Sequence, residues 1–270
     1  MSPRFFAPVL LLALLAPSPV ARAQDPAPKR VVASLGAEHD ALAPGAATTL
    51  VLRLAIRPKW HVYWLNPGDA GVPTTVKLTL PAGVRSTGIR WPAPQRLTHE
   101  DGSVDFAYEE ELTVLIPIEV DETWVGKTVT LKVDSSWLVC KEICVPGEAS
   151  LSLSLPVRAK ASERKLTKFA AAVEAIGPRL TTPLPKGVAA SFSGLTLNLS
   201  APGARGLSWF PLAPEVGGPD NLRRLTSDTH RLAVPYPAGV RQAKRVRGLL
   251  AIRGKTLTTY HWVELPSPKP

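Results

Sequence analysis

Hydrophobic and polar residues alternate through most of the chain, and this alternation predicts β-strands. Leucine takes every second position at Leu50, Leu52 and Leu54, and again over residues 151–155, so each segment has one apolar face. Strands are expected over residues 48–56, 60–64, 75–80, 112–120, 128–135 and 149–155, and later over 195–199, 207–210, 231–234, 247–252 and 260–265. The 19 glycines and 28 prolines lie among these short runs, as in a sandwich with many turns. The pattern predicts a mainly β protein whose first half is an antiparallel sandwich of immunoglobulin type.

One helical pattern interrupts the strands. Leu166, Phe169 and Val173 repeat on one face of residues 163–176, Ser162 is a candidate N-cap, and a Gly-Pro pair follows. The predicted organisation is a signal peptide over residues 1–23, an immunoglobulin-like domain over 29–157, a helical linker over 158–184 and a second, smaller β domain over 185–265.

The first 23 residues have the pattern of a secretory signal peptide. Arg4 supplies a positive start, an apolar run follows, and the small-residue pattern Ala21-Arg22-Ala23 predicts cleavage after Ala23. No later stretch approaches the roughly 20 apolar residues that a membrane helix needs. We therefore expect a mature chain without a transmembrane segment, located in the periplasm, where a disulfide can persist.

Charge divides the chain into two unlike halves. Residues 24–156 contain 12 basic and 16 acidic residues, whereas residues 157–270 contain 18 basic and 6 acidic ones. Opposite signs of net charge favour two modules. The basic run over residues 241–253 is interpreted as a solvated edge strand that discourages pairing between sheets, with docking to an anionic partner or a membrane as the alternative. Nucleic acid is not expected as a partner of an exported chain.

The candidate chemistry rests on the two cysteines, Cys140 and Cys144. They are four residues apart between two predicted strands, on a turn or a single helical turn, and this spacing allows a disulfide. A bridge that closes so short a loop stabilises a fold by only about 2 kcal/mol in the chain-entropy model, less than one that joins distant strands. Lys141 would favour a thiolate and Glu142 would oppose it. These residues fit a structural bridge and a redox pair equally.

Other site classes have less support in the sequence. A Cu(I) or Zn(II) site would need further ligands beside the two thiolates, and the five histidines are isolated in sequence. The motifs of serine hydrolases, zinc proteases and phosphate-binding loops are missing from the sequence. Trp60, Tyr63, Trp64 and Trp91 are interpreted as core and rim of the sandwich, rather than as an aromatic binding surface.

Four sequence blocks, in order, carry a resemblance to a known family. They are residues 59–71 (KWHVYWLNPGDAG), 89–94 (IRWPAP), 106–109 (FAYE) and 137–147 (WLVCKEICVPG). Together they resemble the N-terminal periplasmic domain of the thiol:disulfide interchange protein DsbD family, and more closely the branch of the suppressor of copper sensitivity protein B. The resemblance covers residues 31–156.

The resemblance implies an immunoglobulin-like domain that relays electrons through its cysteine pair, with no cofactor beyond the redox-active disulfide. Cys144 matches the cysteine that enters mixed disulfides, and Cys140 matches the one that resolves them. The implied partners are a membrane-embedded electron-transfer protein, which these 270 residues do not include and which would act in trans, and periplasmic thioredoxin-fold proteins. The implied activity is that of a thiol-disulfide oxidoreductase of the protein-disulfide reductase type.

The resemblance also implies a cap loop over the cysteines. His99, Glu100 and Asp101 fall where family members carry an acidic loop that usually bears an aromatic shield. A Gly-Ser pair stands where that aromatic is expected, so Phe106 and Tyr108 are the candidate substitutes. Two alternatives stay open: an immunoglobulin-like binding module whose disulfide only ties a turn, and a copper(I)-binding protein of copper tolerance.

Overall fold

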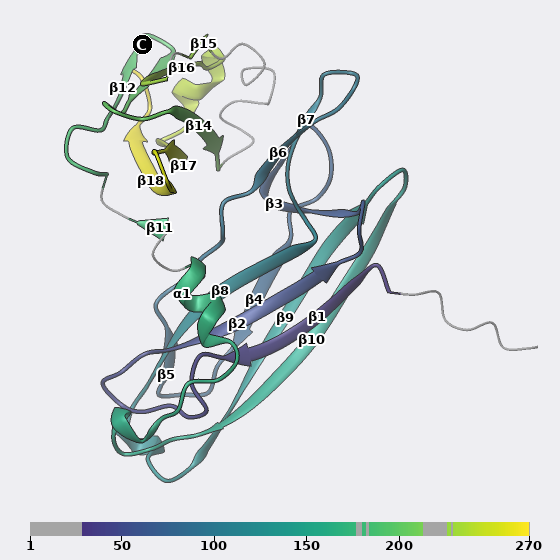
Figure 1. The fold of residues 1–270 in the computed structure, drawn as a ribbon, viewed down its shortest axis with the longest axis vertical. Helices are drawn as coiled ribbons and strands as arrows, with labels where there is room; N and C mark the ends of the chain where they lie inside the picture. The colour runs from purple at the N-terminus through teal and green to yellow at the C-terminus, as the bar shows by residue number, and fades with distance from the viewer. Residues whose placement is uncertain (1–28, 177–179, 182–183, 213–225, 228, 270) are drawn as a thin grey trace, which may run out of the picture.

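The computed structural model describes residues 29–176, 180–181, 184–212, 226–227 and 229–269, and Figure 1 shows the path of the chain. The predicted signal peptide and its cleavage site lie outside these residues. The first ten strands are β1 (Val31–Ala37), β2 (Thr48–Ile56), β3 (His61–Gly68), β4 (Thr75–Thr79), β5 (Val84–Ser86), β6 (Gln95–Thr98), β7 (Val104–Glu109), β8 (Glu111–Val120), β9 (Thr128–Cys140) and β10 (Cys144–Pro156). The later elements are α1 (Ala170–Ile176), β11 (Leu180–Thr181), β12 (Ala189–Ser193), β13 (Thr196–Ser200), β14 (Gly206–Pro211), β15 (Thr226–Ser227), β16 (Arg231–Pro235), β17 (Arg245–Arg253) and β18 (Thr258–Pro266), with 3₁₀ helices at Glu122–Trp124, Ala161–Glu163 and Ala238–Gln242.

Strands β1 to β10 form two antiparallel sheets, which we call the N-terminal sandwich. One sheet has the order β1-β2-β8-β5, and the other has the order β10-β9-β3-β7-β6 with β4 also paired to β9. Alternation along the strands sends apolar side chains inward from both sheets. Leu52 and Leu54 of β2 and Leu131 and Val133 of β9 are completely buried. The predicted fold class, mainly β with an immunoglobulin-like sandwich, is confirmed.

The predicted helix over residues 163–176 is wrong in its first half, because the α-helix begins only at Ala170. Residues 164–167 instead run beside the loop that follows β1, where the backbone N–H of Asp40 donates to the carbonyl of Lys165 (2.9 Å) and that of Thr167 to the carbonyl of Glu38 (2.9 Å). These tertiary hydrogen bonds replace the helical ones. The helical spacing of apolar residues could not reveal this competition, because the loop that supplies the hydrogen bonds is far away in sequence.

Strands β11 to β18 form a second pair of sheets, which we call the C-terminal sandwich. One sheet has the order β11-β18-β17-β14 and the other β12-β13-β16-β15. Between them, the indole N–H of Trp209 on β14 donates to the hydroxyl of Tyr236 (2.8 Å), and both side chains are buried. The interpretation of residues 241–253 as an edge strand is wrong: β17 pairs with β18 on one side and β14 on the other. Its ends are basic, but its middle is a buried run of Gly248 to Ala251.

An aromatic junction joins the two sandwiches. Trp64 of β3 stacks on Trp262 of β18, with ring centroids 6.2 Å apart, and Phe210 of β14 meets both Trp64 and Phe106 edge to face. Beside these rings, the buried amide of Asn66 donates to the backbone carbonyl of Pro211 (2.9 Å). Figure 1 shows the C-terminal sandwich at one end of the elongated N-terminal one. Throughout the described residues, no helix has the length and apolar character needed to cross a membrane.

Candidate functional site

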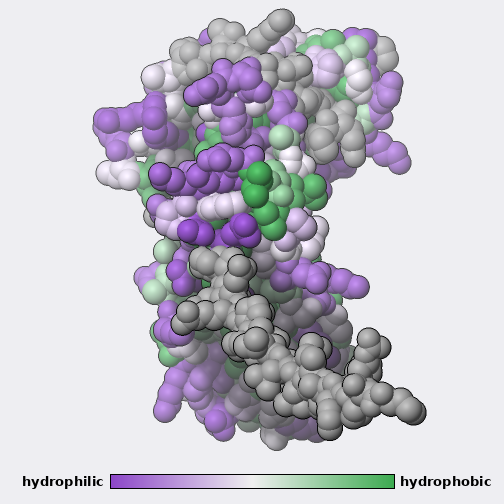
Figure 2. Space-filling model, turned by 90° about the vertical axis from the view of Figure 1, so that its right-hand side faces the viewer, coloured by the Kyte–Doolittle hydropathy of each residue, from purple (hydrophilic) through white to green (hydrophobic). Residues whose placement is uncertain are grey.

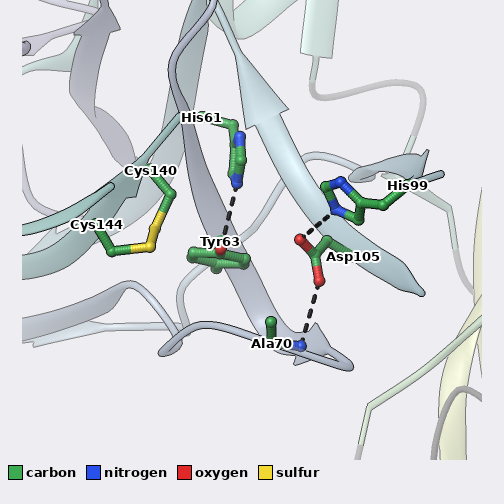
Figure 3. The surroundings of a disulfide bond; sticks show 7 residues. All are labelled: His61, Tyr63, Ala70, His99, Asp105, Cys140 and Cys144. Carbon is green, nitrogen blue, oxygen red and sulfur yellow. Dashed lines mark hydrogen bonds and ion pairs between the residues drawn. A yellow bond between two sulfur atoms is a disulfide. The ribbon is translucent and has the colours of Figure 1, made fainter. Parts of the chain in front are cut away.

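The two cysteines face each other at the end of a β-hairpin. Cys140 is the last residue of β9, Cys144 is the first of β10, and the two are paired in register. Only Lys141, Glu142 and Ile143 separate them, and the N–H of Lys141 donates to the carbonyl of Ile143 (3.1 Å). The cysteines are joined by a disulfide with their Cα atoms 4.1 Å apart. The bond therefore spans a tight strand-to-strand turn and not a turn of helix (Figure 3).

The two ends of the disulfide have different surroundings. Cys140 is only 2% exposed and packs with Tyr63 and Ala107, while Leu97 and Leu138 cover the edge of this small cluster. Cys144, directly across the hairpin, is exposed. The cluster lies on the outer face of the sheet, because the neighbouring residues of β9, such as Val139, point into the core. An incoming group can therefore reach Cys144, whereas Cys140 is shielded.

Tyr63 and His61, two residues apart on β3, form the wall beside Cys140. His61 is paired in register with Cys140, and its Nε2 lies 3.2 Å from the Tyr63 hydroxyl. The two rings meet edge to face (Figure 3). The backbone of Gly71 packs against the Tyr63 ring: a Cβ there would lie 2.2 Å from Tyr63 Cζ. A glycine is needed at this close approach, where φ is also +86°.

Burial sets the protonation of both side chains. Desolvation, together with the negative charge of Asp105, raises the pKa of the Tyr63 hydroxyl to about 12. Burial lowers the pKa of His61, and the nearby Asp105 carboxylate only partly opposes this shift. At neutral pH, Tyr63 is therefore protonated and His61 is neutral. The buried cluster that contains Cys140 therefore holds a protonated Tyr63 hydroxyl, and the His61 ring carries no fixed positive charge.

The candidate cap loop connects β6 to β7 and is fastened at its base. The N–H of His99 donates to the Ser103 carbonyl (2.9 Å), and His99 Nε2 lies 2.7 Å from the buried carboxylate of Asp105. Asp105 also accepts a hydrogen bond from the N–H of Ala70 (3.3 Å) in the loop after β3. In Figure 3, His99 and Asp105 lie on the far side of Tyr63 from the disulfide.

The remaining residues of the candidate cap loop differ in position. Glu100 and Asp101 are exposed, and Asp101 accepts a hydrogen bond from the N–H of Ser103 (2.8 Å). Phe106 and Tyr108 do not shield the cysteines: both belong to the main core, and the Tyr108 hydroxyl donates to the Pro92 carbonyl (2.7 Å). Alternation along β7 explains this, because Ala107 between them is the residue that faces Cys140.

The shield over Cys140 comes from residues that the sequence analysis did not assign to the site. Tyr63, interpreted as core or rim, is the aromatic side chain beside the disulfide, and Leu97 is the residue by which the β6–β7 hairpin covers it. A sequence signal for Tyr63 existed. It stands two residues after His61, so both must share one face of β3, opposite to Trp64. Nothing in the sequence indicated which face would meet the cysteines.

The charged residues between the cysteines neutralise one another. The ammonium of Lys141 lies 2.9 Å from a carboxylate oxygen of Glu142. The hydrogen bond and charge of Lys141 lower the pKa of Glu142, which is fully exposed. Lys141 is therefore not a bare positive charge beside a thiolate. Exposure, rather than the charge of Lys141, is what distinguishes the two sulfurs.

A hollow of about 510 Å³ lies next to the disulfide on the same outer face of the sheet. Leu138 and Pro146, an in-register pair two residues from the cysteines, form its floor, and Val72 forms part of its wall. Val72 is 55% exposed and Ile143, at the hairpin tip, is 61% exposed. Figure 2 shows a mostly hydrophilic face with a compact hydrophobic patch about half-way along the long axis. Ile143, next to Cys144 in sequence, and Val72, in the wall of the hollow, are the exposed apolar side chains near the reachable sulfur.

No three histidine, cysteine, aspartate or glutamate side chains in the described part of the chain converge as a metal site would require. His99 and Asp105 contact each other, and His61 contacts Tyr63. These side chains do not form such a group with the cysteines.

Comparison with known proteins shows which proteins the N-terminal sandwich resembles. Residues 32–156 match the family model of the thiol:disulfide interchange protein DsbD, N-terminal. The crystal structure of the N-terminal periplasmic domain of ScsB from Proteus mirabilis is 18% identical, with a TM-score of 0.60, over 91% of this chain and 97% of that chain. The reduced N-terminal domain of DsbD from Neisseria meningitidis is 17% identical, with a TM-score of 0.32, over 46% of this chain and 85% of that chain. No curated protein sequence matches the chain.

The family match and the ScsB domain agree with the geometry. The ScsB domain shares the fold across both sandwiches, since the match covers nearly all of each chain. The family model ends at Pro156, the last residue of β10, so it takes in the whole disulfide hairpin. The resemblance drawn from the four sequence blocks is confirmed. Residues 32–156 of this chain are similar to the N-terminal domain of DsbD.

Proposed function

We propose that the chain is a periplasmic thiol-disulfide interchange module, which relays reducing equivalents through Cys140 and Cys144. The donor would be a membrane-embedded electron-transfer protein, and the acceptors would be periplasmic thioredoxin-fold proteins. One observation carries the proposal: the disulfide closes a three-residue turn on the outer face of a sheet, with Cys144 exposed and Cys140 buried. Such a bond contributes little to holding the fold, and one of its sulfurs can be attacked.

The exchange follows from the unequal exposure. A donor thiolate attacks Cys144 Sγ, the Cys140–Cys144 bond breaks, and Cys140 leaves as the thiolate. A second thiolate of the donor then attacks the donor sulfur of this mixed disulfide, which oxidises the donor and leaves both cysteines reduced. In the acceptor step, the Cys144 thiolate attacks an acceptor disulfide, and Cys140 resolves the new mixed disulfide. Each cycle moves two electrons and restores the internal bond.

Tyr63 is suited to assist the departure of Cys140. Its hydroxyl stays protonated at neutral pH and lies in the same buried cluster as the leaving sulfur. A thiolate that forms in an apolar cluster needs a hydrogen-bond donor, because a buried anion without one is costly. His61, neutral and 3.2 Å from the hydroxyl, holds Tyr63 in position.

The hollow beside the disulfide supports docking of a protein partner. Its floor of Leu138 and Pro146 continues directly from the cysteine pair. A partner cysteine that reaches Cys144 would bring its flanking residues onto this floor. Apolar flanking residues would bury the exposed side chains of Val72 and Ile143.

Trapping of mixed disulfides tests the proposal. Cys140→Ala and Cys144→Ala both abolish the internal bond, so they are matched in everything except which thiol is left. Expressed in the native host, the Cys140→Ala variant should accumulate a mixed disulfide through Cys144 to the active-site cysteine of a thioredoxin-fold protein. The Cys144→Ala variant should accumulate far less. Equal trapping by the two variants, or none by either, would exclude the proposed relay.

A further inference from the structure

The two ends of strand β17 differ in how their positive charges are compensated. At its start, Arg245 and Arg247 both bind the carboxylate of Glu264, at 2.5 and 3.3 Å. At its end, Arg253 has no carboxylate partner among the described residues, and the same holds for Arg205 and Lys255 nearby. We call Arg205, Arg253, Lys255 and Leu257 the basic end of the C-terminal sandwich.

The basic end surrounds an open cavity of about 850 Å³. Three turns meet there: residues 203–205 before β14, residues 229–230 before β16, and residues 254–257 between β17 and β18. The guanidinium of Arg253 donates to the backbone carbonyl of Arg205 (2.8 Å), which fixes its position at the rim. Arg205, Arg253 and Lys255 are all exposed, so they project their charges to solvent along one surface.

A hydrophobic side chain stands among these cations. Leu257 is 47% exposed at the β17–β18 turn, which is closed by a hydrogen bond from the N–H of Gly254 to the Leu257 carbonyl (2.9 Å). An exposed leucine would add nothing to the binding free energy of a small soluble anion. The cations and Leu257 would both strengthen binding to a bilayer surface, because its phosphates attract cations and its interface accepts an apolar side chain.

We propose that the basic end docks on an anionic phospholipid surface. The cations would meet headgroup phosphates, and Leu257 would enter the boundary between headgroups and acyl chains. The basic excess of the sequence from residue 157 onward, 18 basic against 6 acidic residues, adds long-range attraction to such a surface. This proposal uses none of the residues around the disulfide, so it stands or falls independently of thiol exchange.

Vesicle binding tests the proposal. The chain beginning at Gln24 should sediment at low ionic strength with vesicles that contain phosphatidylglycerol, and should not sediment with pure phosphatidylcholine. The triple variant Arg205→Ser, Arg253→Ser, Lys255→Ser should bind on the order of 100-fold more weakly, since each cation near an anionic surface contributes about fivefold. Leu257→Ser, which changes no charge, should weaken binding by a smaller factor.

A matched control separates this site from net charge. Arg241, Lys244 and Lys269 are exposed cations near the other end of β17, about 26 Å away by strand length. Their replacement by serine removes the same charge and should keep most of the binding. An equal loss in this control, equal binding to both kinds of vesicle, or specific displacement by inorganic phosphate at matched ionic strength would overturn the proposal.

Discussion

Strand β3 sends two neighbouring side chains into two unlike regions of the molecule. Tyr63 points to the outer face and covers Cys140, whereas Trp64 points to the aromatic junction between the sandwiches. The junction is closed: Trp64 is completely buried against three other rings. The disulfide region is half open, with Cys144 exposed beside a shallow apolar hollow. The first region holds the two sandwiches together, and the second leaves one sulfur of a disulfide within reach of other molecules.

The two regions should differ most in how much each contributes to the free energy of unfolding. Trp64→Ala should lower the free energy of unfolding by about 3–5 kcal/mol, the usual cost of removing a large buried aromatic. Trp64→Phe is the matched control. It keeps a ring in the junction and removes the indole N–H, which has no hydrogen-bond partner among the described residues. Denaturant titration measures both variants, and a loss below about 1 kcal/mol for Trp64→Ala would contradict a structural junction.

Removal of the disulfide should lower the free energy of unfolding by less than loss of the aromatic junction does. The chain-entropy model gives about 2 kcal/mol for a five-residue loop, so a Cys140→Ser, Cys144→Ser variant should stay folded with a modest fall in unfolding free energy. Denaturant titration beside the wild type measures this change. A loss as large as that of Trp64→Ala would make the bond a structural staple.

Tyr63→Phe should separate reactivity from stability. It keeps the ring that covers Cys140 and removes only the hydroxyl, so we expect the unfolding free energy to change by less than about 1.5 kcal/mol. The rate of disulfide reduction by a small dithiol should fall about tenfold, the equivalent of one hydrogen bond to a departing thiolate. The rate should be followed against pH. An unchanged rate would remove Tyr63 from the exchange and leave it a packing residue.

The smallest expected effect concerns pH. Burial lowers the pKa of His61 in the folded chain, so below about pH 6.5 the unfolded chain binds a proton that the folded chain does not. Acidification through this window should therefore destabilise the protein. A His61→Gln variant should show a shallower loss of unfolding free energy between neutral and mildly acidic pH. Parallel curves for variant and wild type would mean that His61 has the same pKa folded and unfolded.

Sequence patterns predicted most strands of the molecule because alternation is a local property. The segments predicted around Leu52 and Leu153 are strands β2 and β10, although β10 begins five residues earlier, at Cys144. The early part of β10 lacks alternating leucines, and Gly147 is there so that the Trp137 ring can pack over it: a Cβ would lie 2.4 Å from Trp137 Nε1. Such a close approach between strands leaves no periodic signal.

The errors of sequence analysis came from contacts between distant segments. The extended path before Ala170 is set by hydrogen bonds to the loop after β1, and the interior position of β17 is set by pairing with β14 and β18. The cysteine pair was identified from spacing and resemblance. Its shield was not, because the position of Tyr63 over Cys140 depends on how β3 pairs with β9.

The equilibrium reduction potential of the Cys140–Cys144 disulfide tests the central claim most directly. The wild-type chain would be equilibrated in buffers of reduced and oxidised glutathione, or of a stronger dithiol, and its free thiols counted after acid quenching. A bond that exchanges reducing equivalents should have a potential above about −300 mV. A potential well below about −300 mV would contradict the account, because it would mark a structural disulfide that thiol partners cannot readily open.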